Sequence, residues 1–143
     1  MKLTTNWMEK FRFSATDGTN STTMDTNPPY GEGFLTPKQL CLAAVEGCTA
    51  MDVISHLNKR KQLPKSFSIE ADADLTATHP KVFSEIRLLY HFEGEVQTAL
   101  ALEAVELSQT KYCGVSAMMA KNCPIRYQVF LNGSLVGQGE AKF

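Results

Sequence analysis

A long apolar segment in the first half of the sequence constrains the fold more than any other feature. Residues 40–54 are apolar on nearly every side when they are placed on a helix. Thr36 is a suitable N-cap, and Pro37 fits the first helical position, where a missing N–H costs nothing. A helix that is apolar all round is typical of a buried position. We therefore predict a buried central helix that runs from Pro37 to about Arg60.

Segments with alternating apolar and polar residues surround this helix and predict half-buried strands. Asp17-Gly18 and Asn132-Gly133 are turn signals that favour hairpins. The pattern predicts an α+β chain of three hairpins around two or three helices. The expected strands are 7–15, 21–25, 67–77, 86–92, 125–131 and 135–143, and the further helices are 96–108 and 111–120.

Length and composition indicate a single domain and argue against proteins that bind nucleic acid or span a membrane. The chain has 143 residues, which predicts one domain over residues 1–143. A net charge of −1 gives no basic surface for nucleic acid or an anionic membrane. No uninterrupted apolar run approaches about 18 residues, so no membrane-spanning helix is predicted. The first residues lack an apolar block of signal-peptide length, so we expect a cytoplasmic protein with reduced or redox-active cysteines.

Cys48 lies in the middle of the apolar helix, well beyond its first turn. Burial raises the pKa of a thiol, and the helix dipole acts only near the helix ends. A nucleophilic Cys48 therefore needs another group to stabilise its thiolate. The alternative is that Cys48 is a small buried hydrophobic side chain.

Two acidic residues interrupt the same apolar segment. Asp52 lies one helical turn beyond Cys48 and shares its face, whereas Glu46 points roughly the other way. A charge at such a position is costly unless it is paired. Pairing with an arginine would give either a structural ion pair or a relay that positions the arginine over the Cys48 thiolate. The chain offers four arginines for this, Arg12, Arg60, Arg87 and Arg126.

Cys113 opens the short helix expected at 111–120. Free N–H groups at a helix start, together with Lys111, predict a lowered pKa for this thiol. Cys41 lies two helical turns before Cys48, too far for a disulfide, and Cys123 precedes a strand, so both are interpreted as core residues. The spacing of His and Cys residues predicts no metal site, and no phosphate-binding glycine loop predicts a cofactor.

Several segments together resemble the OsmC/Ohr family, named after osmotically induced protein C and the organic hydroperoxide resistance protein. The OsmC-like subgroup of that family is the most similar. The resemblance extends from about Thr36 to Val129 and, more loosely, over the N-terminal hairpin. The matching segments are TPKQL at 36–40, AA at 43–44, GCTAMDV at 47–53, HPKVF at 79–83, AVELS at 104–108, KYCGVSA at 111–117 and PI at 124–125.

The resemblance implies an intertwined homodimer in which antiparallel sheets from both chains wrap around two long central helices. It also implies a thiol peroxidase of the oxidative stress response. Cys48 matches the peroxidatic cysteine, whose thiolate attacks an organic hydroperoxide and becomes a sulfenic acid. Cys113 matches the resolving cysteine, which forms a disulfide that an external dithiol reduces. Apart from the external dithiol reductant, no cofactor is implied. Glu46 and Asp52 remain candidates for supporting residues.

Two positions differ from the pattern of the Ohr branch. Lys38 stands where an acidic residue follows the helix-opening proline, and Thr16 stands where the activating arginine precedes Asp-Gly. Two hypotheses therefore remain open. The first is a peroxidase that acts on organic hydroperoxides. The second is a protein of the same fold, without peroxidase activity, that binds a small apolar ligand or senses redox state at the dimer interface.

Overall fold

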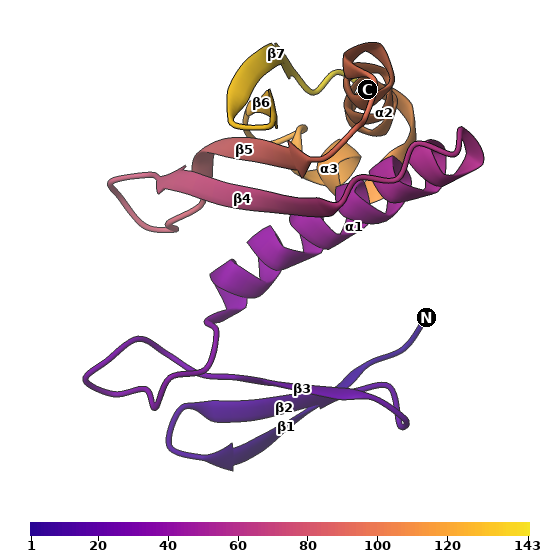
Figure 1. Ribbon diagram of the computed structural model, residues 1–143. Coiled ribbons are helices and arrows are strands. Elements are labelled where there is room, and N and C mark those ends of the chain that lie inside the picture. Colours follow the sequence, from indigo (N-terminus) through magenta and orange to yellow (C-terminus); the bar gives the residue numbers. More distant parts are fainter. The chain divides into compact units, whose positions relative to one another are not determined.

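The computed structural model describes residues 1–143. The contacts within the chain group it into two compact units, residues 1–42 and residues 43–143 (Figure 1). The first unit holds three strands and the start of a long helix. The second holds the rest of that helix, four strands and three further helical segments.

The first unit contains a three-stranded antiparallel sheet. Its strands are β1 (Thr4–Glu9), β2 (Arg12–Thr16) and β3 (Ser21–Met24), in the order β1-β2-β3. The prediction of one strand over 7–15 is wrong, because the chain turns at Lys10, which adopts a positive φ of 48°. That turn contains no Gly, Pro, Asn or Asp, so it carries no turn signal in the sequence. The turn at Asp17 is confirmed, since its carboxylate accepts the N–H groups of Thr19 and Asn20.

Helix α1 (Pro37–Lys59) begins in the first unit and continues into the second. Its start is fixed by a reciprocal cap. The Gln39 N–H donates to Thr36 Oγ1 at 3.3 Å, and the Thr36 N–H donates to Gln39 Oε1 at 2.8 Å. This capping box confirms the predicted N-terminus of the helix.

Burial of α1 is less complete than its composition predicts. Only one stripe, spaced four residues apart, is buried within the chain: Val45, Thr49, Val53 and Leu57. Met51, in the same helix, is 75% exposed. The prediction of burial on every side is therefore wrong for a single chain. By length and average hydropathy α1 could also cross a membrane, a property that central helices of soluble domains share.

The second unit is built on a four-stranded sheet in the order β4-β5-β6-β7. Its strands are β4 (Ser66–Leu75), β5 (Phe83–Glu93), β6 (Ile125–Leu131) and β7 (Ser134–Glu140). The pairs β4–β5 and β6–β7 are antiparallel hairpins, as expected. Strands β5 and β6 are parallel, in contrast to the expected antiparallel sheets. A helical connection joins these two strands, and such a crossover brings the chain back in the same direction.

The crossover contains three consecutive helical segments. These are α2 (Thr98–Leu107), the π-helical turn η1 (Ser108–Tyr112) and α3 (Gly114–Met119). The predicted helix over 111–120 is thus shorter and is preceded by a wide turn. Gly137 of β7 allows α2 to approach the sheet closely, because a Cβ there would overlap Leu102.

The core lies on one face of this sheet. Alternate residues of β5 are fully buried there, namely Ile86, Leu88, Tyr90 and Phe92. A side-chain hydrogen bond links Tyr90 to Thr49 of α1, so α1 lies against this face. The core therefore forms between this face of the sheet and α1, the helix that carries Cys48.

Candidate functional site

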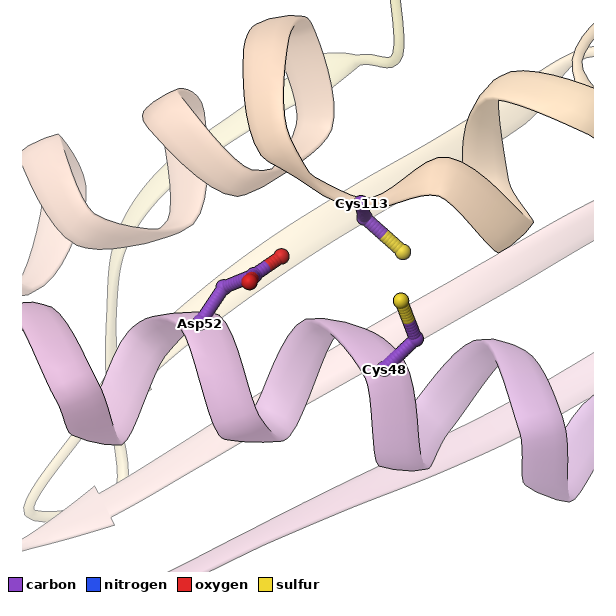
Figure 2. A group of neighbouring side chains, drawn as sticks. All are labelled: Cys48, Asp52 and Cys113. Atoms are coloured by element: carbon purple, nitrogen blue, oxygen red, sulfur yellow. The ribbon is translucent and has the colours of Figure 1, made fainter.

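Two cysteines and one carboxylate from distant parts of the chain meet in the second unit. Cys48 and Asp52 project from α1. Cys113, the single residue between η1 and α3, faces them (Figure 2). The two sulfur atoms and a carboxylate oxygen all lie within 4.8 Å of one another. We call Cys48, Asp52 and Cys113 the thiol–carboxylate cluster. Both thiols are free in this structure.

Local backbone geometry explains why Cys113 reaches α1. In η1 the Cys113 N–H donates to the Ser108 carbonyl at 2.9 Å, five residues back. Cys113 itself has φ −70° and ψ 96°, so the helix stops there before α3 begins. Such π-helical turns are rare and are frequently found at functional sites. The sequence offered no signal for this turn, and the linear spacing of the two cysteines does not predict their contact.

The environment of Cys113 differs from the one predicted. The side chain is fully buried, and this burial raises the pKa of Cys113 to about 11. The predicted lowering of its pKa is therefore wrong. The Ser116 N–H donates to the Cys113 sulfur at 3.3 Å, and the Ser116 side chain also favours the thiolate, but both effects are smaller than that of burial. Lys111 lies over the Tyr112 ring, 5.2 Å from its centroid.

Cys48 is the more accessible thiol of the pair. It is half-buried within the chain, whereas Cys113 has no exposed surface. The alternative interpretation of Cys48 as a small buried hydrophobic side chain therefore does not fit this chain by itself. The other two cysteines lie outside the cluster. Cys123 is buried, as expected, and Cys41 is half-buried.

A chain of buried polar groups holds Asp52 in place. Ser108 Oγ lies 2.9 Å from Asp52 Oδ2 and 2.8 Å from Thr49 Oγ1. Thr49 Oγ1 is 2.8 Å from the Tyr90 hydroxyl, which accepts a hydrogen bond from Gln109 Nε2 at 2.9 Å. A carboxylate only accepts and the amide nitrogen only donates, so all protons of the chain can point toward Asp52. We call Ser108, Thr49, Tyr90 and Gln109 the hydroxyl relay.

Sequence reasoning missed the hydroxyl relay. All four of its residues are fully buried. The available signal was Thr49, a polar residue on the buried stripe of an otherwise apolar helix, together with Tyr90 at a core-facing strand position. Buried polar groups need partners, so these two positions could have indicated a network, although not its members.

Glu46 does not belong to the cluster. Its carboxylate is near the backbone of Ala71 in β4, and desolvation raises its pKa. It lines a hollow of about 240 Å³ together with Phe67 and Ile69. The two acidic residues of α1 therefore point in different directions, as the helical spacing predicted.

The expected pairing of Glu46 or Asp52 with an arginine is wrong for the three arginines of the second unit. Each of the four arginines pairs with other carboxylates: Arg12 with Glu9 and Glu32, Arg60 with Glu103, Arg87 with Asp72, Asp74 and Glu85, and Arg126 with Glu85 and Glu140. Thr16, at the family's arginine position, donates to the Asn20 carbonyl at 2.7 Å. Asp52 thus forms no ion pair with an arginine of this unit.

One cavity borders the cluster at Asp52. The cavity has a volume of about 200 Å³, and its lining includes Asp52, His56, Lys59, Leu107 and Tyr112. A larger hollow of about 530 Å³ lies over strands β5, β6 and β7 and contains none of the cluster residues. Of these two cavities, only the smaller one is lined by a residue of the cluster, Asp52.

A family model and a curated relative both match most of this chain. A family model described as OsmC-like protein matches residues 30–128. Protein YhfA of Escherichia coli K12 is 29% identical over 123 residues, which cover 85% of this chain and 90% of YhfA.

Solved structures share the fold over nearly the whole chain. A hypothetical protein from Aquifex aeolicus is 27% identical with a TM-score of 0.78, covering 92% of this chain and 96% of that one. A Legionella pneumophila protein described as organic hydroperoxide resistance protein OsmC has a TM-score of 0.63 at 24% identity, covering 90% and 94%. The matched family region contains Cys48, Asp52 and Cys113, and the chain belongs to the OsmC-like protein family.

Proposed function

We propose that this protein is a thiol peroxidase that reduces organic hydroperoxides to alcohols. The observation that carries the proposal is the convergence of Cys48 and Cys113, which are distant in sequence, within 4.8 Å of each other. Two free thiols at this distance can form a disulfide after a small side-chain movement, because the bond requires about 2.0 Å between the sulfurs. A purely structural pair of cysteines needs no such approach.

The exposure of the two thiols assigns their roles. A peroxide must reach the first thiol, and Cys48 is the half-exposed one. The Cys48 thiolate attacks the distal oxygen of the hydroperoxide, and the O–O bond breaks. The alkoxide leaves and takes up a proton to become the alcohol, while Cys48 becomes a sulfenic acid.

Cys113 completes the cycle from its buried position. Its raised pKa keeps it protonated at neutral pH, so it does not compete for peroxide. Its sulfur then attacks the Cys48 sulfenic acid, so that an S–S bond forms and the S–O bond breaks. Asp52 accepts the Cys113 proton in this step and passes it to the leaving hydroxide, which departs as water, while Ser116 donates to the thiolate as it forms. An external dithiol reduces the disulfide by exchange and is itself oxidised.

The same proposal includes a homodimer in the cytoplasm. Most of the apolar surface of α1 is left uncovered within one chain, including Ala43, Ala44 and Met51. A second copy offers the same apolar helix, so two such faces can cover each other around a twofold axis. Four free cysteines suit a reducing compartment.

A single-turnover reaction tests the peroxidase. The reduced protein is mixed with cumene hydroperoxide or hydrogen peroxide in the presence of a chelator, quenched by alkylation and mapped by mass spectrometry. We expect a Cys48–Cys113 disulfide that forms faster with the organic peroxide. Cys48→Ser should abolish peroxide consumption, Cys113→Ser should leave a trapped sulfenic acid, and Cys41→Ser should behave as wild type. Survival of both thiols in excess peroxide would contradict the proposal.

The ion pairs formed by the arginines favour a second function, one without peroxidase activity. No arginine of the second unit lies beside the cluster to stabilise a thiolate, since Arg60, Arg87 and Arg126 all pair with other carboxylates. The corresponding proposal is an OsmC-like protein without peroxidase activity that binds a small apolar ligand or senses redox state at the dimer interface. Thiols that survive excess peroxide, together with a ligand that co-purifies and is released on unfolding, would support it.

A further inference from the structure

We propose that the reduced thiol–carboxylate cluster is a binding site for a thiophilic divalent cation such as Zn²⁺, and that the bound cation and the Cys48–Cys113 disulfide exclude each other. Cation binding itself does not depend on the proposed function. Release of the cation by peroxide rests on the peroxidase proposal.

The donor set and its spacing fit such a cation. Zn²⁺ binds thiolate sulfur at about 2.3 Å and carboxylate oxygen at about 2.0–2.2 Å, in tetrahedral geometry. These bond lengths put neighbouring donor atoms roughly 3.5–3.8 Å apart. The three donors already lie within 4.8 Å of one another and point toward a common centre (Figure 2). An approach of about 1 Å brings them to ligand distance, and two thiolates select a soft cation over Mg²⁺ or Ca²⁺.

The Asp52 carboxylate is available to a cation, because no ion pair occupies it. Asp52 forms no ion pair with any Lys or Arg of the second unit, and its only hydrogen-bond partner is the Ser108 hydroxyl. Binding of Zn²⁺ displaces the protons of both thiols, so two protons are released for each cation bound. The resulting site carries two thiolates and one carboxylate, with a net charge of −1 around the divalent cation.

The groups behind the donors are already arranged as they are around metal ligands. Ligating carboxylates are held by outer hydrogen bonds, and here Ser108 and the rest of the hydroxyl relay hold Asp52 Oδ2. The Cys113 sulfur accepts the Ser116 N–H at 3.3 Å. The Ser116 hydroxyl is fully buried and makes no other hydrogen bond, so it is free to donate to a Cys113 thiolate. These donors stabilise the anionic form of Cys113 that a cation requires.

The protein supplies three ligands, which leaves one position of a tetrahedral cation for water. Cys48 and Asp52 are half-exposed, so the cation and this water can enter from their side. Oxidation then empties the site. The two thiolates lose two electrons and form the disulfide, the hydroperoxide takes those electrons with two protons to give alcohol and water, and Zn²⁺ is released. A disulfide has no thiolate to bind the cation, so occupancy and oxidation are alternatives.

Metal titration of the reduced, chelator-treated full-length protein tests the inference under anaerobic conditions and without peroxide. Zn²⁺ is measured by competition with a chromophoric chelator. Co²⁺ serves as a visible probe, because Zn²⁺ has a filled d shell. We expect one cation to bind per chain. The Co²⁺ form should show a charge-transfer band from thiolate to cobalt in the near ultraviolet, with the intensity of two bound thiolates. Cys48→Ser and Cys113→Ser should each halve that band, and Asp52→Asn should weaken Zn²⁺ binding at least about tenfold.

Matched controls separate the cluster from the rest of the chain. Cys41→Ser removes a thiol of the same helix, and Glu46→Gln removes a carboxylate that points elsewhere, so both should bind as wild type. Unchanged binding in Cys48→Ser, loss of binding in Cys41→Ser, or no binding at micromolar Zn²⁺ would overturn the inference. Circular dichroism verifies that each variant is folded.

The two proposals fail in distinguishable ways. Cation binding is measured without peroxide, and the single-turnover peroxide reaction is measured with a chelator. Zn²⁺ binding without peroxide consumption would support this inference and contradict the peroxidase proposal. Peroxide consumption without Zn²⁺ binding would support the peroxidase proposal and contradict this inference. With both activities present, one equivalent of Zn²⁺ should slow disulfide formation at least about tenfold, and an unchanged rate would overturn the mutual exclusion.

Discussion

Ser108 Oγ lies 2.9 Å from Asp52 Oδ2, so one hydroxyl joins helix α1 to the turn that ends at Cys113. Each of the two residues in this contact is also close to one of the thiols. Asp52 lies one turn from Cys48 on α1, and the Ser108 carbonyl accepts the N–H of Cys113. The carboxylate and the buried thiol are therefore positioned by the same residue.

Ser108→Ala should destabilise the protein. The substitution removes the donor to Asp52 and leaves the fully buried Thr49 hydroxyl without one partner, which costs about 1–3 kcal/mol. Urea unfolding measures the effect. Thr110→Ala is the matched control, because its hydroxyl bonds the Glu106 carbonyl on an exposed part of the same segment. Equal unfolding midpoints for the two variants would contradict a structural role for the relay.

Tyr90→Phe tests the other end of the relay with little change in volume. It removes the hydroxyl that accepts from Gln109 Nε2 and bonds Thr49, and it leaves both of these buried groups short of a partner. We expect a loss of about 1–3 kcal/mol in the free energy of unfolding. Tyr112→Phe, on an exposed side chain, should change it by less than about 0.5 kcal/mol. A stabilised Tyr90→Phe variant would show that the relay is not required for stability.

The stability of the reduced protein should fall as the pH rises through the alkaline range. Cys113 has a pKa of about 11 when folded, because it is buried, and about 8.5 when unfolded. The unfolded chain therefore releases this proton first. The stabilisation is complete below about pH 8.5 and is lost progressively up to about pH 11.

Chemical unfolding of wild type and Cys113→Ser at several pH values measures this contribution. Subtraction of the two curves removes the effects of Cys123 and Tyr90, whose pKa values are also raised by burial. The difference should shrink between about pH 8.5 and pH 11. A difference that is independent of pH would mean that burial does not raise the pKa of Cys113.

Alkylation should distinguish the two thiols of the cluster. Near neutral pH, iodoacetamide should modify half-exposed Cys48 at least about tenfold faster than Cys113, because burial both shields Cys113 and raises its pKa. Peptide mapping after timed quenching gives both rates. Cys123, which is also buried, serves as an internal reference for slow modification. Faster modification of Cys113 would reverse the proposed roles of attacking and resolving thiol.

Local sequence determined much of the secondary structure. The cap at Thr36, the apolar run of α1 and the turn at Asn132-Gly133 all correspond to the structure, with both turn residues at positive φ. These features depend on side chains that interact with their own neighbouring backbone, so the sequence alone specifies them. The turn at Lys10 escaped prediction because no residue there favours a positive φ.

Tertiary structure decided the chemistry of the site. The sequence identified Cys48, Cys113 and Asp52 as candidates, and the helical period placed Asp52 on the face of Cys48. Only the crossover between β5 and β6, with its π-helical turn, brings Cys113 to that face. Only the packing makes Cys113 the buried thiol and reverses the predicted direction of its pKa shift. The pKa of a thiol and the contacts of a carboxylate depend on neighbours that are distant along the chain, and a linear pattern does not specify those neighbours.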